Sequence, residues 1–350
     1  LTTATLLTMA LAGNVQAAEI RSVGPDGEAA VDASTIELTD DQIAQIKEGG
    51  YTAAICLHYG GNDWSTSQQK GLEDTFGELG IEIVAVTDAN FSAETQVSNI
   101  ETVMAKKPDI LVSIPTDATA TADAYKQAAA AGIKIVFMDQ RANGLEAGKD
   151  YVSVVSADNY GNGYASGTVL GDALGGKGKV AMVYYDANFA PTNQRDEGFR
   201  DAMKNYPDIE IVTEQGFTDE SGCAEQGDAI LTQFPNIDGI YASWDVPMEG
   251  VLSAVRAAGM EGKVTLACND LGNNVAREIA SGNIAGGGAQ MPYDQGVAEA
   301  KLAALALLGE ETPSYVAVPA ETVTHENVLE AYTDVYHVET PDWLKEAYVE

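Results

Sequence analysis

Short apolar runs alternate with longer amphipathic stretches along the chain from Tyr51 onward. Most of these runs are rich in Ile and Val, and such continuous hydrophobicity is typical of strands that are covered on both faces of a sheet. They lie at 53–57, 81–86, 110–114 and 133–138, and again at 179–184, 209–212, 239–242 and 264–268. Strands separated by helix-length stretches at this spacing predict βαβ units and parallel sheets.

The stretches between these runs have the periodicity of helices. We expect helices in the first series at 65–79, 94–106 and 118–131. Gly132 follows the last of these helices as a C-terminal cap. In the second series, an apolar stripe at helical spacing is formed by Met248, Val251, Leu252 and Val255. The two series predict an α/β fold with two doubly wound parallel-sheet lobes, and the cleft between them is the natural ligand site.

The start of the chain resembles a targeting segment. The first eighteen residues carry no charge and include an apolar run from Leu6 to Ala12, which is too short to span a bilayer. Val15 and Ala17 are small residues at the spacing that a signal peptidase reads. We therefore interpret residues 1–17 as a signal peptide remnant whose basic start is missing. A buried helix is the alternative.

Residues 18–50 separate this segment from the alternating part of the chain. Thr39 and Gln42 have capping-box spacing, which predicts a short helix through Lys47. We interpret the segment as an N-terminal appendage that packs on the first lobe and carries no chemistry.

The charge of the chain narrows the classes of partner. Its 350 residues include 53 Asp and Glu against 19 Lys and Arg, which gives a formal net charge of -34, while 45% of the residues are hydrophobic. This composition describes a folded, acidic protein. It disfavours nucleic acids and anionic membranes as partners, because both repel a polyanion. With the signal peptide removed, we expect a soluble, exported protein in the periplasm.

The cysteines and histidines do not indicate a metal site. Of the three cysteines, Cys56 and Cys268 lie inside predicted strands, and Cys223 lies outside them. They do not form a disulfide framework, although a bridge between Cys223 and Cys268 stays open. The three histidines show no zinc-ligand spacing. We expect neither a metal nor a cofactor.

Polar and aromatic side chains follow nearly every predicted strand. Functional residues in open α/β sheets collect just past the carboxyl ends of the strands. Carboxylates, amides and Arg form paired hydrogen bonds with vicinal hydroxyls, and aromatic rings cover the C–H face of a sugar. The pattern predicts a site for a polyhydroxylated ligand. The candidate ligand-binding residues are Asn62, Trp64, Asp139, Arg141, Asp158, Arg195, Phe217, Trp244, Asp270 and Gln290.

Each of these residues also has a purely structural interpretation. An Asp between a strand and a helix is commonly an N-cap, which applies to Asp117, Asp158 and Asp245. For Trp64 and Trp244 the alternative is a place in a core, and for Arg195 it is a solvated helix face. The coincidence of so many such residues at successive strand ends carries more weight than any one of them.

Several segments match the motifs of one family in the same order along the chain. They are Asn62-Asp63-Trp64, Ile114-Pro115-Thr116-Asp117, Phe137-Met138-Asp139-Gln140-Arg141, Arg195-Asp196-Glu197-Gly198-Phe199, Asp270, and the Gln290–Gly296 segment. Together they resemble the periplasmic sugar-binding proteins of the ribose- and galactose-binding type, which are soluble receptors of ABC importers and relatives of the lac-repressor ligand domain. The resemblance covers about Thr52 to Val323.

The resemblance implies a type I periplasmic binding protein whose chain crosses between the lobes three times. The crossings would lie near 156–158, 289–291 and 318–322. Lobe one would comprise 51–156 and 291–319, and lobe two 157–290 and 320–350. The glycines at 286–288 precede the second crossing and suit a hinge that changes its backbone angles.

The resemblance also implies a function for the candidate residues. A monomeric solute-binding protein would close on a small neutral sugar or polyol and deliver it to an ABC transporter permease. Lobe one would contribute Asn62, Trp64, Asp139 and Arg141; lobe two would contribute Arg195, Trp244 and Asp270, with Gln290 at the hinge.

Departures from the family pattern leave the identity of the ligand open. Trp244 and Ile114 stand where the ribose binder carries Asn, Asn269 stands where it carries Phe, and Gln140 separates Asp139 from Arg141. A furanosyl or other non-sugar signalling ligand is the alternative within the binding class, with a chemoreceptor or a sensor kinase as the partner.

Enzymes and transcription factors are disfavoured. The chain has no G-x-S-x-G elbow, no GxxxxGK[ST] phosphate loop and no basic helix-turn-helix. The partial glycine pattern of Gly161, Gly163 and Gly167 is better explained by close helix packing. A calcium loop at 88–92 is disfavoured, because it lacks the required Gly and the terminal acid.

Overall fold

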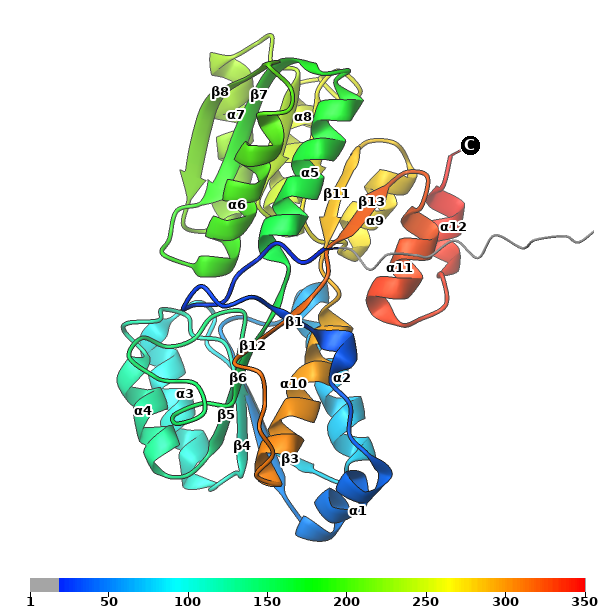
Figure 1. The fold of residues 1–350 in the computed structure, drawn as a ribbon. Coiled ribbons are helices and arrows are strands. Elements are labelled where there is room, and N and C mark those ends of the chain that lie inside the picture. Colours follow the sequence, from blue (N-terminus) through cyan, green and yellow to red (C-terminus); the bar gives the residue numbers. More distant parts are fainter. Residues whose placement is uncertain (1–18, 350) are drawn as a thin grey trace, which may run out of the picture.

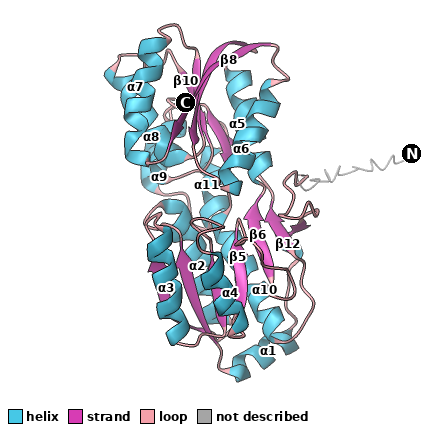
Figure 2. Ribbon diagram, turned by 90° about the vertical axis from the view of Figure 1, so that its left-hand side faces the viewer, coloured by secondary structure: helices cyan, strands magenta, loops and turns pink. Residues whose placement is uncertain are grey.

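A computed structural model describes residues 19–349, so the signal peptide predicted for residues 1–17 lies outside the described residues. Two α/β lobes lie end to end (Figure 1). Each lobe has one sheet between layers of helices (Figure 2). This confirms the predicted fold class. No helix within residues 19–349 is both long and apolar enough to cross a membrane.

The sheet of lobe one has seven strands in the order β1-β12-β6-β5-β4-β2-β3, and all its pairings are parallel. The strands are β1 (Val31–Asp32), β2 (Thr52–Leu57), β3 (Glu82–Asp88), β4 (Ile110–Ser113), β5 (Lys134–Met138), β6 (Ser153–Ala157) and β12 (Tyr315–Val318). One face packs against α2 (Asp63–Glu78) and α10 (Pro292–Leu307), and the other against α3 (Ala93–Ala105) and α4 (Ala122–Ala130). Two short helices precede β2, η1 (Ala33–Thr35) and α1 (Asp40–Gly49).

The sheet of lobe two has six strands in the order β13-β11-β10-β9-β7-β8, and the edge strand β13 is antiparallel to β11. The strands are β7 (Lys177–Tyr185), β8 (Asp208–Phe217), β9 (Gly239–Ala242), β10 (Thr265–Cys268), β11 (Gly286–Ala289) and β13 (Glu321–Thr324). One face packs against α5 (Asn159–Ala173) and α6 (Ala190–Met203). The other face is covered by η2 (Glu220–Gly222), α7 (Cys223–Gln233), α8 (Asp245–Ala257), α9 (Asn273–Ala280), α11 (Val328–Tyr336) and α12 (Asp342–Ala347).

Most of the predicted elements are confirmed. All eight apolar runs contain strands, the stripe of α8 is buried, and Thr39 and Gln42 form the capping box of α1. Helix α4 begins at Ala122 instead of residue 118, because the Asp117 carboxylate accepts hydrogen bonds from the next backbone N–H groups and fixes a turn. The strands β1, β6, β11, β12 and β13 are not among the eight predicted runs; β1 has only two residues, and β11 is mostly glycine.

Within residues 19–349 the chain passes from one sheet to the other after β6, after β11 and after β12. The glycines expected to act as a hinge at 286–288 instead form the buried strand β11. A Cβ atom on Gly288 would lie 2.2 Å from the carbonyl oxygen of Asn162, and one on Gly287 would lie 1.7 Å from that of Cys268. These glycines are therefore needed for close approach to the neighbouring backbone rather than for flexibility.

Glycines also bring helix α5 into close contact with α6. A Cβ atom on Gly163 would lie 1.8 Å from the carbonyl oxygen of Arg195, and one on Gly167 would lie 2.6 Å from the Cβ of Ala202. The close helix packing predicted for these two positions is confirmed. Helix α6, which carries Arg195, is thereby held against α5.

The N-terminal segment, residues 19–32, contacts both lobes, whereas the sequence predicted an appendage on the first lobe alone. The backbone N–H groups of Arg21 and Ser22 donate to the Asp158 carboxylate at 2.9 and 2.8 Å. The Arg21 guanidinium lies 4.1 Å from the centre of the Tyr164 ring on α5 of lobe two. The segment then returns to lobe one, where β1 pairs with β12. In Figure 1 it runs across the waist of the molecule.

The three cysteines, Cys56, Cys223 and Cys268, are buried and free. The bridge left open between Cys223 and Cys268 is absent from the structure.

Candidate ligand-binding cavity

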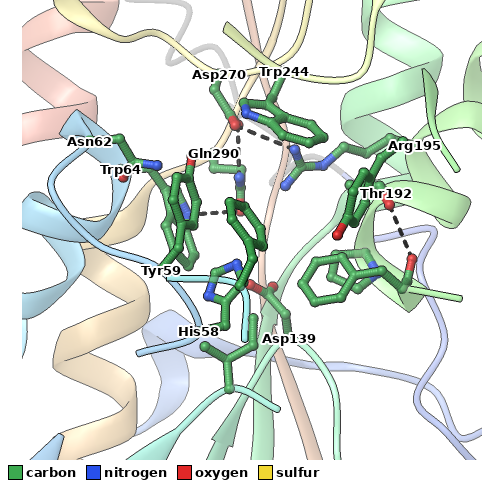
Figure 3. A pocket seen from close by; sticks show the side chains of 15 residues that line it. His58, Tyr59, Asn62, Trp64, Asp139, Thr192, Arg195, Trp244, Asp270 and Gln290 are labelled. Atoms are coloured by element: carbon green, nitrogen blue, oxygen red, sulfur yellow. Dashed lines mark hydrogen bonds and ion pairs between the residues drawn. The ribbon is translucent and has the colours of Figure 1, made fainter. Parts of the chain in front are cut away.

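A cavity lies between the lobes, just past the carboxyl ends of strands from both sheets (Figure 3). The empty space between its lining atoms, with the space at its mouth included, is about 450 Å³. It is lined by His58, Tyr59, Asn62, Trp64, Phe91, Ile114, Asp139, Tyr185, Phe189, Pro191, Thr192, Arg195, Trp244, Asp270 and Gln290.

Seven of the ten residues selected from the sequence line this cavity. They are Asn62, Trp64, Asp139, Arg195, Trp244, Asp270 and Gln290. The first three come from lobe one and the next three from lobe two, while Gln290 lies on the second crossing. A bound ligand would therefore contact both lobes at once.

Gln290 links the side chains of the two lobes. Its Oε1 accepts a hydrogen bond from Trp64 Nε1 at 3.2 Å, and its Nε2 donates to Asp270 Oδ1 at 2.7 Å. The indole of Trp64 and the carboxylate of Asp270 are thereby fixed against each other across the crossing strand (Figure 3).

Arg195 is held in one orientation by three protein acceptors. Its Nε donates to Asn159 Oδ1 at 2.9 Å, and its Nη1 donates to the Ser243 carbonyl and to Asp270 Oδ2, both at 3.3 Å. The side chain is buried, with an accessibility of 6%. Since no acceptor among residues 19–349 is bonded to Nη2, this nitrogen can donate to a ligand.

Asp139 offers the complementary acceptor from lobe one. Its Oδ1 accepts hydrogen bonds from Ser156 Oγ at 2.9 Å and from Asn159 Nδ2 at 3.4 Å. Among the described residues, no donor is bonded to its Oδ2. Burial raises the pKa of this carboxyl, and the positive charge of Arg195 opposes the shift. Hydroxyl donors from a ligand would stabilise the ionised form.

The backbone at both cavity carboxylates is in the left-handed region. Asp139 has φ 55° and Asp270 has φ 69°. Such angles are costly for residues other than glycine and cluster at binding sites, where the surrounding structure holds them. Asp139 directly follows the buried strand β5, and Asp270 lies two residues after β10, so each strained turn directs a carboxylate from the end of a strand into the cavity.

Aromatic rings form most of the remaining wall. Tyr59 stacks on Phe91 with ring centres 4.2 Å apart, and Tyr185 meets Trp244 edge to face at 5.6 Å. His58, which contacts Tyr59 and Phe91, stacks on Phe189 at 5.4 Å. The cavity thus joins charged hydrogen-bonding groups with flat apolar surfaces, which suits a ligand with hydroxyl edges and C–H faces.

His58 is a buried, uncharged member of this wall. Burial lowers its pKa to about 3, so the imidazole is neutral at physiological pH. Its Nδ1 is buried and has no hydrogen-bond partner among the described residues. A ligand hydroxyl at this position would satisfy a polar atom that the protein leaves unpaired.

Eight of the lining residues were not selected from the sequence: His58, Tyr59, Phe91, Ile114, Tyr185, Phe189, Pro191 and Thr192. His58 and Tyr59 directly follow β2, and Phe189 directly precedes α6, so their places next to strand and helix ends could have identified them. Phe91 follows a more exposed strand and enters the wall through a turn with positive φ, which the sequence does not reveal.

The structure places Arg141 outside the cavity. Both of its terminal nitrogens donate to the Asp26 carboxylate of the N-terminal segment at 2.7 Å. The preceding residue, Gln140, takes the place toward lobe two, where its Oε1 accepts a hydrogen bond from the Ala190 backbone N–H at 3.1 Å. The extra residue between Asp139 and Arg141 therefore turns the guanidinium away from the cavity.

Asp158 and Phe217 also lie outside the cavity lining. Asp158 caps α5 by accepting from the Gly161 N–H at 2.9 Å and binds the N-terminal segment with both oxygens, which agrees with its structural interpretation as an N-cap. Phe217 packs behind Trp244, with ring centres 5.1 Å apart, and belongs to the core of lobe two.

Hydrogen bonds between the lobes surround the cavity. The Asp63 carboxylate at the start of α2 accepts from the backbone and side-chain nitrogens of Asn273 on α9, at 2.7 and 3.0 Å. Tyr59 from lobe one donates its hydroxyl to Glu220 of lobe two at 3.2 Å. The structure therefore has the lobes closed over the cavity.

The described residues were also compared with the groupings of side chains that bind metal ions. Within residues 19–349, no three His, Cys, Asp or Glu side chains are grouped in a way that could hold a metal ion.

Curated relatives align with most of the chain. A ribose import binding protein from Bacillus subtilis is 27% identical over 213 residues, which is 60% of this chain and 67% of the relative. A D-ribose/D-allose-binding protein from Pseudomonas aeruginosa is 29% identical over 273 residues, which covers 75% of this chain and 83% of the relative.

Solved structures show the same fold. An ABC transporter periplasmic solute binding protein from Actinobacillus succinogenes with bound D-allose has a TM-score of 0.73 and 29% identity, and the match covers 79% of this chain and 99% of that one. A solute binding protein from Agrobacterium vitis bound with α-D-tagatopyranose has a TM-score of 0.76 and 25% identity, covering 83% of this chain and 100% of that one.

The family model for the periplasmic binding protein domain matches residues 53–311, which span parts of both lobes and all of the cavity residues. The two-lobed fold, the cavity between the lobes and this match agree: the chain belongs to the periplasmic binding protein family.

Proposed function

We propose that this protein captures a small neutral sugar or polyol in the cavity between its lobes and delivers it to an ABC importer. The observation that carries the proposal is that the cavity presents a carboxylate oxygen, Asp139 Oδ2, and a guanidinium nitrogen, Arg195 Nη2, neither of which is hydrogen-bonded by residues 19–349, within a wall of aromatic rings. Vicinal hydroxyls donate to the first and accept from the second.

Binding and closure are coupled in this arrangement. Asp139 and Asn62 belong to lobe one, and Arg195 and Trp244 belong to lobe two. Because a ligand contacts both sets only when the lobes are together, it stabilises the closed arrangement by the free energy of the added contacts. The named relatives support this use of the cavity, since they include a ribose import binding protein and solute binding proteins with bound D-allose and tagatopyranose.

The cellular setting forms part of the proposal. We infer an exported, monomeric, non-enzymatic protein that acts in the periplasm after removal of residues 1–17. The apolar, uncharged start of the sequence and the family support this setting. Its partner would be an ABC transporter permease, and a pull-down from membranes would distinguish this partner from a chemoreceptor or a sensor kinase.

Titration calorimetry tests the proposed function. The panel contains pentoses, hexoses, their deoxy forms and polyols, each added to protein that was unfolded and refolded to remove carried ligand. We expect at least one member to bind with 1:1 stoichiometry. If none of them binds, the assignment to sugars and polyols is wrong.

A further inference from the structure

A hydrogen-bonded contact next to the cavity joins residues of both lobes. Glu220 lies on η2 of lobe two, outside the cavity lining. Its Oε1 accepts a hydrogen bond from Trp244 Nε1 of the same lobe at 2.7 Å and from the Tyr59 hydroxyl of lobe one at 3.2 Å. One carboxylate oxygen therefore joins two aromatic residues of the cavity wall, which Figure 3 shows on different sides of the cavity.

The surroundings of Glu220 show what this bond does for the carboxylate. The side chain is half-buried, and burial together with the charges of Asp219 and Glu249 raises its pKa, while the hydrogen bonds from Trp244 and Tyr59 act in the opposite direction. A partly buried carboxylate without its donors is costly. Separating the lobes removes the Tyr59 donor, so the lobe-one residue contributes stability only in the closed arrangement.

Tyr59 is well suited to this role. Its ring stacks on Phe91 and lies edge to face with His58, with ring centres 4.2 and 5.1 Å apart. The hydroxyl is therefore presented by a rigid wall rather than by a mobile side chain. The cross-lobe pair of Asp63 and Asn273 closes another part of the rim, at the starts of α2 and α9.

We propose that Glu220 is a latch that sets the rate at which the bound ligand leaves the cavity. It acts through Tyr59 and Trp244 and is therefore a positioning residue, with no contact to the ligand itself. This inference rests on the proposed function, since it deepens the description of the same site. The latch forms only when the lobes close, so it holds a ligand already in the cavity and affects dissociation more than association.

Stopped-flow measurements with a sugar identified by calorimetry test the latch. We expect Glu220→Ala to release the sugar about tenfold faster than wild type, with little change in the association rate, because one charge-assisted hydrogen bond between the lobes is lost. Glu220→Gln keeps the acceptor oxygen and is expected to restore a rate near that of wild type. Glu214→Ala is the matched control, because that glutamate pairs with Arg200 inside lobe two.

A double-mutant cycle separates the latch from a general loss of stability. Tyr59→Phe keeps the ring but removes the hydroxyl. If the two residues act through one bond, the double variant Tyr59→Phe with Glu220→Ala releases the sugar about as fast as Glu220→Ala alone. Additive effects of the two substitutions, or an unchanged release rate in Glu220→Ala, would overturn the proposal.

Distances between spin labels at Glu101→Cys and Asp228→Cys give a readout that needs no ligand. Both positions are exposed, on α3 of lobe one and α7 of lobe two, and the three native cysteines are buried. In the empty protein, we expect Glu220→Ala to have less of the short, closed distance than wild type. Equal distributions contradict the latch. Failure of every sugar to bind contradicts the proposed function instead, and the label distances still decide about Glu220.

Discussion

Arg195 shows how a single side chain serves both the fold and the ligand. Three protein acceptors use its Nε and Nη1, and its Nη2 is left at the cavity. A lysine would keep the positive charge but has no planar fork to contact Asn159, Asp270 and a ligand together.

We therefore expect Arg195→Lys to weaken sugar binding by about a hundredfold or more, because the variant loses several buried, charge-assisted hydrogen bonds. Titration calorimetry measures the affinity, and thermal unfolding shows whether the variant still folds. Arg200→Lys is the control on the same helix, where the side chain pairs with Glu214 away from the cavity. Equal affinities of the two variants would show that Arg195 does not contact the ligand.

Asp196, the residue next to Arg195, provides a test through pH. It is buried beneath Ser243 and Tyr241, and burial raises its pKa from 3.8 to about 6. The folded state thus keeps a proton that the unfolded state releases above about pH 4. Stability is lost as pH rises from about 4 to about 6 and is then constant, with a total effect of about 3 kcal/mol.

Urea unfolding of wild type and of Asp196→Asn checks this linkage. The other acidic groups are common to both proteins and cancel in the difference. We expect the free energy of unfolding of wild type, relative to the variant, to fall between pH 4 and pH 7. Parallel pH profiles would mean that Asp196 titrates with the same pKa in the folded and unfolded states.

For single residues, the sequence predicts which side chains lie near the ends of strands better than it predicts where those side chains point. Asp139 and Asp270 could be selected because they lie within two residues of the ends of buried strands. Arg141 could not be placed, because its direction depends on the extra residue Gln140 and on Asp26, a partner more than a hundred positions earlier in the chain. His58 has a similar limit, since its neutral, buried state depends on rings from three other segments.

Among the elements, helix α5 determines how closely the layers of lobe two approach. It is buried along most of its length and contacts α6 and β11 through glycines, with Gly163 against the backbone of Arg195. The apolar pattern of the sequence does not predict how closely these elements approach, because glycine has no side chain to enter a hydrophobic pattern. The hinge interpretation of residues 286–288 failed for this reason.

Gly163→Ala is therefore expected to lower the free energy of unfolding by about 1–3 kcal/mol, the usual cost of overpacking, and to weaken sugar binding by displacing Arg195. Denaturant unfolding and calorimetry measure the two effects. Gly77→Ala on α2 is the control, since a Cβ atom there meets nothing within 4 Å and alanine favours a helix. A stable Gly163→Ala variant with unchanged affinity would contradict this account of the α5–α6 contact.

On the scale of the whole molecule, the N-terminal segment ties the two lobes together at their first crossing. Asp158 binds the backbone of Arg21 and Ser22, while Asp26 binds Arg141 on lobe one. We expect Asp158→Ala to release the segment, to increase hydrogen exchange in residues 19–29 and to lower the free energy of unfolding by about 2–4 kcal/mol, because buried donors lose their acceptor.

The sugar affinity of Asp158→Ala shows whether Asp158 holds the N-terminal segment or binds the ligand directly. Asp158 lies outside the cavity lining, so its loss should change the affinity much less than the loss of Arg195 does. An affinity loss as large as that of Arg195→Lys, with unchanged hydrogen exchange in the segment, would restore Asp158 as a ligand-binding residue. Ser34→Ala, an exposed change farther along the chain, is the control.

The pairing of β1 with β12 also has a consequence for the order in which the protein folds. Val31 lies near the start of the described chain, and its partner Val316 lies near the end. The sheet of lobe one cannot acquire its edge until almost the whole chain has left the ribosome, and contacts so distant in sequence form slowly. The sheet of lobe one is therefore completed only after the β7–β11 part of lobe two has been made.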